Sequence, residues 1–268
     1  MVGSKFSNES TRGSAKAISS MLNPKGLTSA TVTKVLRRLV YPLLKAEGFD
    51  DWTSRCAWRR LGQRIDAVDF ASLGTHEALG GPYTPCSFFV HLGIKTPALG
   101  LLQGSKSVPE EPRPHTYELP LQAWLIAPVD VGIPGPHLIW NVASERDAEA
   151  CAIEIAKQFR EFALAWLSRP YPPEELLPLV LRPDPEVIVQ QAPNGATLRL
   201  SAGKFESPAH NYMLARLYYA IDQFSLAAEH FEKARWAKNR KTGALFLFRS
   251  PDDDAELRRL AEECARKA

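Results

Sequence analysis

The sequence predicts an α+β fold: an antiparallel sheet of four to five strands, helices packed on one face, and a C-terminal helical hairpin. Three observations lead to this fold. Residues 29–47 repeat apolar side chains with a helical period, segments between residues 54 and 95 alternate with the period of a strand, and further helical patterns follow residue 144. The chain has 268 residues, 45% of them hydrophobic, which is enough for a sizeable core.

The first predicted helix covers residues 29–47. Its apolar face consists of Val32, Val35, Leu36, Leu39, Val40, Leu43 and Leu44. Thr28 or Ser29 can cap its start, and Gly48 stands where a helix-ending glycine belongs. Pro42 lies inside the pattern and removes one backbone donor, so we expect the helix to bend there without ending.

Alternating segments predict the sheet. The predicted strands cover residues 54–61, 64–71, 87–95, 119–127 and 137–142. Gly62 and Gln63 form a short turn signal, so the first two strands are expected to pair as a hairpin. Proline- and glycine-rich loops are expected between the other strands.

Helical patterns dominate the second half of the chain. Helices are predicted after Ser144 to about residue 168, at residues 174–181, 208–220 and 224–238 and from Pro251 onward, with strand-like pieces at 187–190 and 197–200. Pro- and Gly-rich sequence after residue 183 suggests a boundary. We therefore expect a disordered arm (1–27), an α+β domain (28–182) and a mainly helical C-terminal subdomain (183–268).

The α+β part resembles a known family. The sequence contains, in this order, LVYPLLKAEGF, SRCAWRR, RIDAVDF, SFFVHLG and IWNVASERDAEACAIEIAKQF. Over about residues 32–167 this order resembles the bacterial family called domain of unknown function 4304. The resemblance implies helices against one face of an antiparallel sheet and no agreed activity, although some members look like parts of toxin–antitoxin or immunity neighbourhoods. The chain departs from the family between Phe70 and Ser87. Just after the second strand, where the family usually has a polar residue, this chain has Ala71.

The C-terminal hairpin is similar to a single tetratricopeptide unit. The matching positions are Leu214, Ala215, Tyr218, Phe224, Ala227, Phe231 and Ala234. Asn211 replaces the usual first aromatic residue, and the usual closing proline is absent. Because one unit cannot bury its own apolar face, the hairpin is expected to dock on the main domain or on another subunit.

Composition narrows the functional classes. Residues 1–64 hold twelve basic residues against four acidic ones, a net +8 in a chain of net +3, which suggests either a solvated helix face plus a tail or a basic surface for nucleic acid. The four cysteines form no C-x-x-C pair, which favours reduced thiols and a cytoplasmic location. No run of about 18 apolar residues predicts a membrane span.

No catalytic motif is present. The chain lacks the G-x-S-x-G, HExxH and phosphate-loop patterns. Its six histidines show no metal-ligand spacing. The sequence therefore predicts no cofactor and no metal, and it favours a role other than catalysis.

The candidate binding residues are Trp58, Arg59, Asp69 and His91. His91 lies in the middle of a predicted strand, on the side opposite Phe88, Val90 and Leu92. If those apolar residues face the core, His91 points to a sheet face without helices, where the other three would complete the polar floor of a pocket. The alternative is a half-exposed histidine with no task, while Asp66 or Asp69 pairs with Arg59 or Arg60 across the hairpin.

Together these observations predict a bacterial interaction or immunity-like protein that binds a protein partner without catalysis. A small-ligand binder or enzyme with a pocket on the open sheet face is the first alternative. Nucleic-acid binding through the basic N-terminal third is the second. The oligomeric state is left open.

Overall fold

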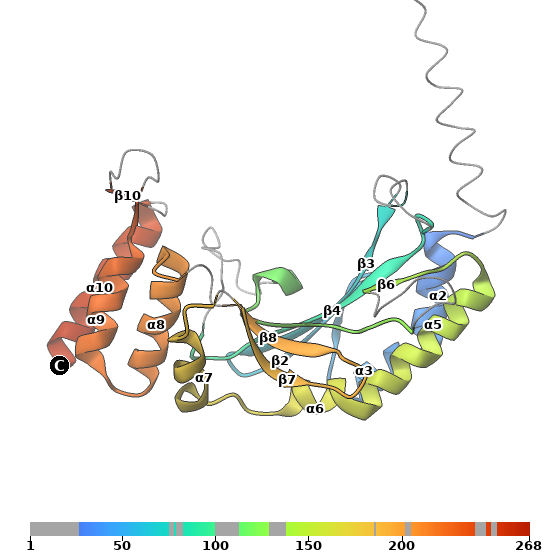
Figure 1. Cartoon of the computed structure of the whole chain (residues 1–268), viewed down its shortest axis with the longest axis horizontal. Coiled ribbons are helices and arrows are strands. Elements are labelled where there is room, and N and C mark those ends of the chain that lie inside the picture. Colours follow the sequence, from blue (N-terminus) through green and yellow to red (C-terminus); the bar gives the residue numbers. More distant parts are fainter. Residues whose placement is uncertain are drawn as a thin grey trace, which may run out of the picture.

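One antiparallel sheet forms the centre of the molecule (Figure 1). The computed structural model describes residues 27–74, 78, 83–99, 113–128, 138–184, 186–201, 205–238, 245–247 and 251–268. Within these residues the sheet has eight strands: β1 (Asp51–Trp52), β2 (Cys56–Leu61), β3 (Arg64–Ser72), β4 (Phe88–Lys95), β5 (Leu121–Trp124), β6 (Ile139–Trp140), β7 (Glu186–Gln191) and β8 (Thr197–Ser201). Their order is β1-β2-β3-β4-β5-β8-β7, and β6 pairs with β4.

Helices lie along one side of this sheet and at one end of the molecule (Figure 1). They are α2 (Ser29–Leu39), α3 (Tyr41–Ala46), α5 (Glu145–Gln158), α6 (Leu164–Ser168), α7 (Pro173–Val180), α8 (Pro208–Ala220), α9 (Phe224–Ala234) and α10 (Pro251–Lys267). A π-helical turn, η2 (Phe159–Ala163), joins α5 to α6, and η1 (Thr116–Glu118) is a short 3-10 turn. A two-stranded ribbon pairs β9 (Trp236–Lys238) with β10 (Leu245–Leu247).

The main core lies between the sheet and helices α2 and α5. Its largest fully buried side chains include Trp140, Phe70 and Phe88. Thr28 caps α2 by accepting from the backbone N–H of Thr31, as the sequence suggested. The prediction of an α+β fold with helices on one face of an antiparallel sheet is therefore confirmed.

The first helix is divided, whereas a single bent helix was predicted. Helix α2 ends at Leu39, and α3 begins at Tyr41 with Pro42 in its first turn. Proline has no N–H to continue the helical ladder, but it fits the first turn of a new helix, where those donors are free. Pro42 therefore marks a helix start, and the predicted bend is a break at Val40.

The sheet is also larger than the predicted four to five strands. β8 pairs with β5, with Leu121 opposite Leu200, and it buries Leu198 and Leu200 in the main core. The segment 186–201 therefore belongs to the sheet, and the predicted boundary at residue 183 is misplaced. The helical part begins after Ser201. The predicted disordered arm (1–27) lies, except for Leu27, outside the described residues.

The predicted C-terminal helical hairpin is present as α8 and α9, and α10 packs against α9. Met213, Leu214 and Leu217 of α8 join the main core, while the opposite side of α8 contributes to a smaller cluster with α9 and α10. The imidazole Nε2 of His210 lies 2.9 Å from the carbonyl oxygen of Val180 at the end of α7. The hairpin is thus docked on the main domain, as expected.

Candidate binding surface on the second sheet face

Three of the four candidate residues share the sheet face opposite α2 and α5, which we call the second face. Asp69 of β3 is directly opposite His91 of β4. Trp58 of β2 is opposite Ala67, two residues from Asp69 and therefore on the same face. The strand pairing brings together Trp58, Asp69 and His91 as the sequence suggested.

Arg59 does not belong to this group, and its predicted place beside the other three is corrected. Successive strand residues point to opposite faces, so Arg59 enters the core side, where only 5% of its surface is exposed. Its Nε and Nη2 donate to Asp66 at 3.0 and 2.7 Å, and its remaining donors reach the carbonyl oxygens of Glu47 and Leu167. Arg59 and Asp66 form the predicted cross-strand pair, which is structural.

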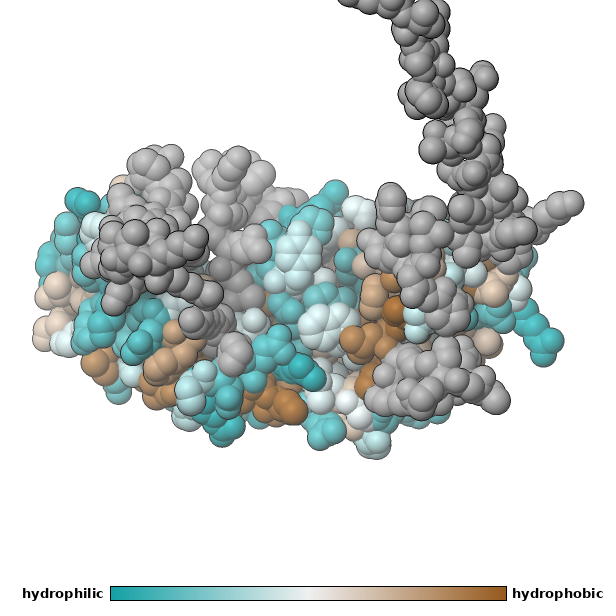
Figure 2. All heavy atoms as spheres, turned by 45° about the horizontal axis from the view of Figure 1, so that its top comes forward, coloured by the Kyte–Doolittle hydropathy of each residue, from teal (hydrophilic) through white to brown (hydrophobic). Residues whose placement is uncertain are grey.

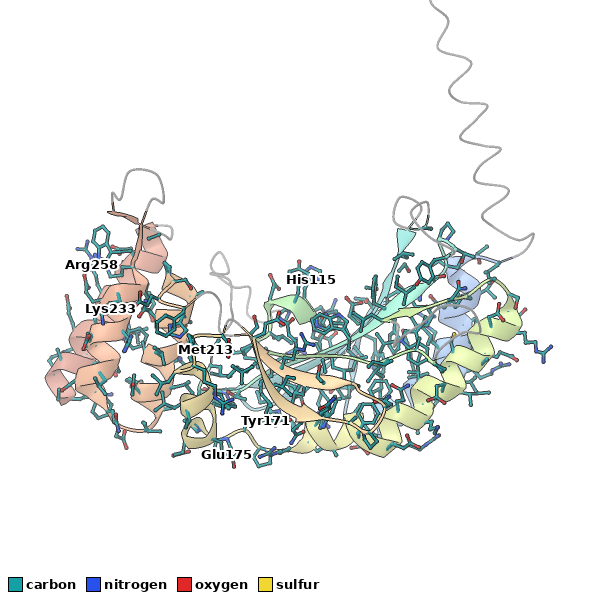
Figure 3. The ribbon with its side chains drawn as sticks, viewed as in Figure 1. His115, Tyr171, Glu175, Met213, Lys233 and Arg258 are labelled. Atoms are coloured by element: carbon teal, nitrogen blue, oxygen red, sulfur yellow. The ribbon has the colours of Figure 1, made fainter. Side chains whose placement is uncertain are left out.

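The centre of the second face is covered by residues 113–120, which we call the cover segment. Trp58 Nε1 donates to the carbonyl oxygen of Pro114 at 2.9 Å. The hydroxyl of Thr116 lies 2.7 Å from Nδ1 of His91. A side chain at Gly93 would bring its Cβ within 2.9 Å of the Thr116 carbonyl oxygen, so glycine is needed for this close approach. In Figure 3, His115 marks this segment above the sheet.

Burial makes the titratable groups beneath the cover segment unreactive. It lowers the pKa of His91 to about 4, so the imidazole is neutral near pH 7. Burial, followed by the neighbouring Asp69, raises the pKa of the Cys56 thiol to about 12, and this thiol donates to Asp69 at 3.1 Å. Burial also raises the pKa of Asp69. A protonated thiol and a neutral, buried imidazole do not form an activated nucleophile.

No metal site is found either, within the part of the chain that the structure describes. No group of three or more His, Cys, Asp or Glu side chains there could hold a metal ion. The covered centre of the second face thus contains mainly stacked and hydrogen-bonded groups, and the buried Nε2 of His91 has no hydrogen-bond partner among the described residues.

Beyond the cover segment, the second face continues over β5, β8 and β7, which we call the uncovered part. A hollow of about 370 Å³ is lined there by Trp124, Ile126, Leu138, Glu186, Gly195, Thr197 and Arg199. The Trp124 ring stacks on the His91 imidazole, with centroids 4.3 Å apart and planes 6° from parallel. The buried histidine therefore fixes the orientation of the aromatic ring that lines the hollow.

Exposed apolar side chains lie in this hollow and on the same face. Leu138, which lines the hollow, is 45% exposed, and Ile188 of β7, which lies opposite the lining residue Arg199 of β8, is 53% exposed. Tyr117 of the cover segment is also 53% exposed. An ion pair between Glu186 and Arg199, 3.0 Å long, lies at its rim. Figure 2 is turned toward this side of the molecule and shows brown apolar atoms interrupting the teal hydrophilic surface.

Sequence reasoning missed Trp124, Tyr117 and Ile188. A signal for the cover segment was present: Gly93 in the interior of a strand indicates that another backbone approaches closely. No comparable local signal exists for Ile188, because its exposure depends on β7 being the last strand of the sheet.

The basic N-terminal third offers fewer free charges than its composition suggested. Arg60 pairs with Asp51 at 3.0 Å, and Arg64 pairs with Asp66 at 2.8 Å. Arg38 forms an ion pair with Glu149 of α5. With Arg59, these arginines form ion pairs within the fold.

No family model, curated protein or solved structure matches the chain in the three comparisons. The resemblances to domain of unknown function 4304 and to a tetratricopeptide unit therefore stay predictions. Among the described helices, none combines the length and the apolar character that crossing a bilayer requires.

Proposed function

We propose that this protein is a non-enzymatic interaction protein, immunity-like in character, that binds a protein partner through the uncovered part of its second face. The observation that carries the proposal is the hollow lined by Trp124 and the exposed Leu138. Ile188 is exposed on β7 opposite the lining residue Arg199, and Tyr117 is exposed on the cover segment. Buried aromatic anchors and arginine, ringed by polar groups, are typical of the residues that dominate protein interfaces. We keep the cytoplasm as the proposed location.

The chemistry of the partner follows from the hollow. Trp124, Ile126 and Leu138 offer apolar contact, and Glu186 with Arg199 offers one acceptor and one donor group at the rim. A partner that inserts one large apolar side chain, flanked by polar groups, would match both features. The stacking of His91 on Trp124 pre-orients the ring, which reduces the entropy lost on binding.

Catalysis on the same face is the less supported alternative. It requires an activated acid, base or nucleophile near the hollow. The pKa of Cys56 is raised to about 12, and His91 is buried beneath the cover segment with only 7% of its surface exposed. Neither group is presented to a substrate in the hollow.

Site-specific photo-crosslinking in the native host tests the proposal. Benzoylphenylalanine is placed at Ile188 and at Tyr117, and, as a matched control, at Ile153 on the opposite helical side, which is 61% exposed. We expect a defined adduct with one other protein from positions 188 and 117 and none from position 153. Equal adducts from all three positions, or none from 188 and 117, would contradict the proposal. An adduct of twice the chain mass with purified protein would instead identify a second copy as the occupant.

A further inference from the structure

A second concave site lies between the sheet and the C-terminal helices, away from the uncovered part of the second face. This cleft has a volume of about 690 Å³. It is lined by the β2–β3 turn, the segment after β4, the connection between α6 and α7, and the end of α8. Figure 3 shows Tyr171 and Met213 in this region, where α7 and α8 approach the strands.

The walls of the cleft are mainly apolar and held in place. Four prolines line it, namely Pro97, Pro170, Pro172 and Pro173, together with the rings of Tyr171 and Tyr219. The Tyr171 hydroxyl donates to the carbonyl oxygen of Trp166, and the Tyr219 hydroxyl donates to Glu263, each at 2.9 Å. Both hydroxyls are therefore occupied elsewhere. Such a wall suits an apolar molecular body.

One wall also carries polar atoms without partners. Thr96 is 3% exposed, and in the described part of the chain its buried hydroxyl has no hydrogen-bond partner. The buried Nε of Arg216 likewise has none there, although Nη2 of the same guanidinium donates to the carbonyl oxygen of Pro97 at 2.8 Å. Because Pro97 follows Thr96, the two unpartnered groups lie on the same wall. A buried donor without a partner destabilises the protein, so a ligand acceptor that reaches both groups would be favoured.

The charge near this wall is positive. Lys95 is half-buried, makes no ion pair with any residue that the structure describes, and lies close enough to Arg216 for the two cations to repel. Arg64 also lines the cleft, but its guanidinium is committed to Asp66. Asp222 is the acidic residue of the lining. The unpaired positive charge therefore lies on the side of Thr96.

Glu256 of α10 is close enough to interact electrostatically with Arg216, but its carboxylate is already hydrogen-bonded to Arg259. Its two carboxylate oxygens accept from Arg259 at 2.7 and 2.8 Å. Glu256 therefore does not accept from the Nε of Arg216, which has no partner among the described residues. The carboxylate of a ligand could accept from this Nε and place negative charge near the cations of Lys95 and Arg216.

We propose that this cleft binds a small carboxylic acid with an apolar body, whose carboxylate accepts from Thr96 and Arg216 while its body lies against Tyr171, Tyr219 and the prolines. Unlike the protein-binding proposal, this site takes a small molecule, and either can hold without the other. The carboxylate gives orientation, and the walls give most of the contact area.

Isothermal titration of the full-length chain tests this inference with defined probes. The probes are benzoate, 1-naphthoate and decanoate, each compared with its uncharged amide. We expect at least one acid to bind with a dissociation constant below about 1 mM and its amide to bind at least about tenfold more weakly. Equal binding of acid and amide, or no binding of any acid up to about 10 mM, would overturn the proposal.

Substitutions in and outside the cleft test whether the acid binds there. Arg216→Met should weaken the best acid by about ten- to a hundredfold, and Thr96→Val, which keeps the shape of the side chain, by about three- to tenfold. Arg37→Met removes one positive charge from α2, outside the cleft, and should leave the affinity unchanged. Circular dichroism checks that each variant is folded. A loss in Arg37→Met equal to that in Arg216→Met, or affinity unchanged in folded Thr96→Val and Arg216→Met, would overturn the assignment.

Discussion

Acidification should destabilise this protein through His91. Burial holds the pKa of His91 at about 4 in the folded state, whereas the exposed imidazole of the unfolded chain has its ordinary pKa of 6.5. Between pH 6.5 and pH 4, His91 binds a proton in the unfolded chain but stays neutral in the folded chain. The stabilisation is therefore complete above pH 6.5 and is lost as the pH falls toward 4. For these two pKa values, linkage gives a loss of about 2 kcal/mol between pH 7 and pH 5, and about 3 kcal/mol between pH 7 and pH 4.

The assay is urea unfolding at pH 7, 6, 5 and 4, with His91→Asn as the matched variant. Asparagine keeps an amide group near the position of Nδ1, which lies 2.7 Å from the Thr116 hydroxyl, but it does not titrate. The variant loses the ring stacked on Trp124, so its stability at pH 7 is expected to be lower. Subtracting its free energy of unfolding from that of the wild type cancels the other titrations. A difference that stays constant from pH 7 to pH 4 would refute the reasoning, because it would mean that His91 protonates equally in both states.

Three further results are expected. Gly93→Ala should cost about 1–3 kcal/mol of unfolding free energy in urea, because the new Cβ meets the cover segment, and unchanged stability would show that the segment does not pack there. Arg59→Met should cost about 3–5 kcal/mol by leaving Asp66 short of a partner, and Arg59→Met/Asp66→Leu should recover much of it in a thermal melt. Cys56 should react with iodoacetamide at pH 8 about a thousandfold more slowly than in urea, measured by peptide mass spectrometry, and fast alkylation of the native thiol would contradict its raised pKa.

Local signals in the sequence located most elements. Helix α8 begins and ends where predicted, since Ser207 caps it and Pro208 occupies its first turn. Strands β3 and β4 were recognisable because their alternating residues separate Val68 and Phe70, which face the core, from Asp69 on the other face. These signals depend on neighbours within a few positions.

Contacts between distant segments were not predictable in this way. The pairing of β8 with β5 joins residues almost 80 positions apart, and the sequence of neither strand indicates with which strand it pairs. The same limit applies to the candidate site. Strand alternation predicted that His91 points away from the apolar residues of its strand, but the predicted group also included Arg59, which lies on the opposite face. The cover segment over Trp58 and His91 comes from a Pro-rich stretch with no periodic pattern. The exposed residue Ile188 became a candidate only when β7 was found at the sheet edge.

The most direct test of the proposed function is the affinity of the crosslinked partner for two variants, measured with purified proteins. Ile188→Asp places a charge beside the hollow, and Ile153→Asp makes the same change at a comparably exposed position on α5. We expect Ile188→Asp to weaken binding by at least about tenfold, because a charge must then be desolvated at the interface, while Ile153→Asp binds like the wild type. Unchanged binding by Ile188→Asp, or an equal loss in both variants, would contradict the assignment of the uncovered part of the second face as the binding surface.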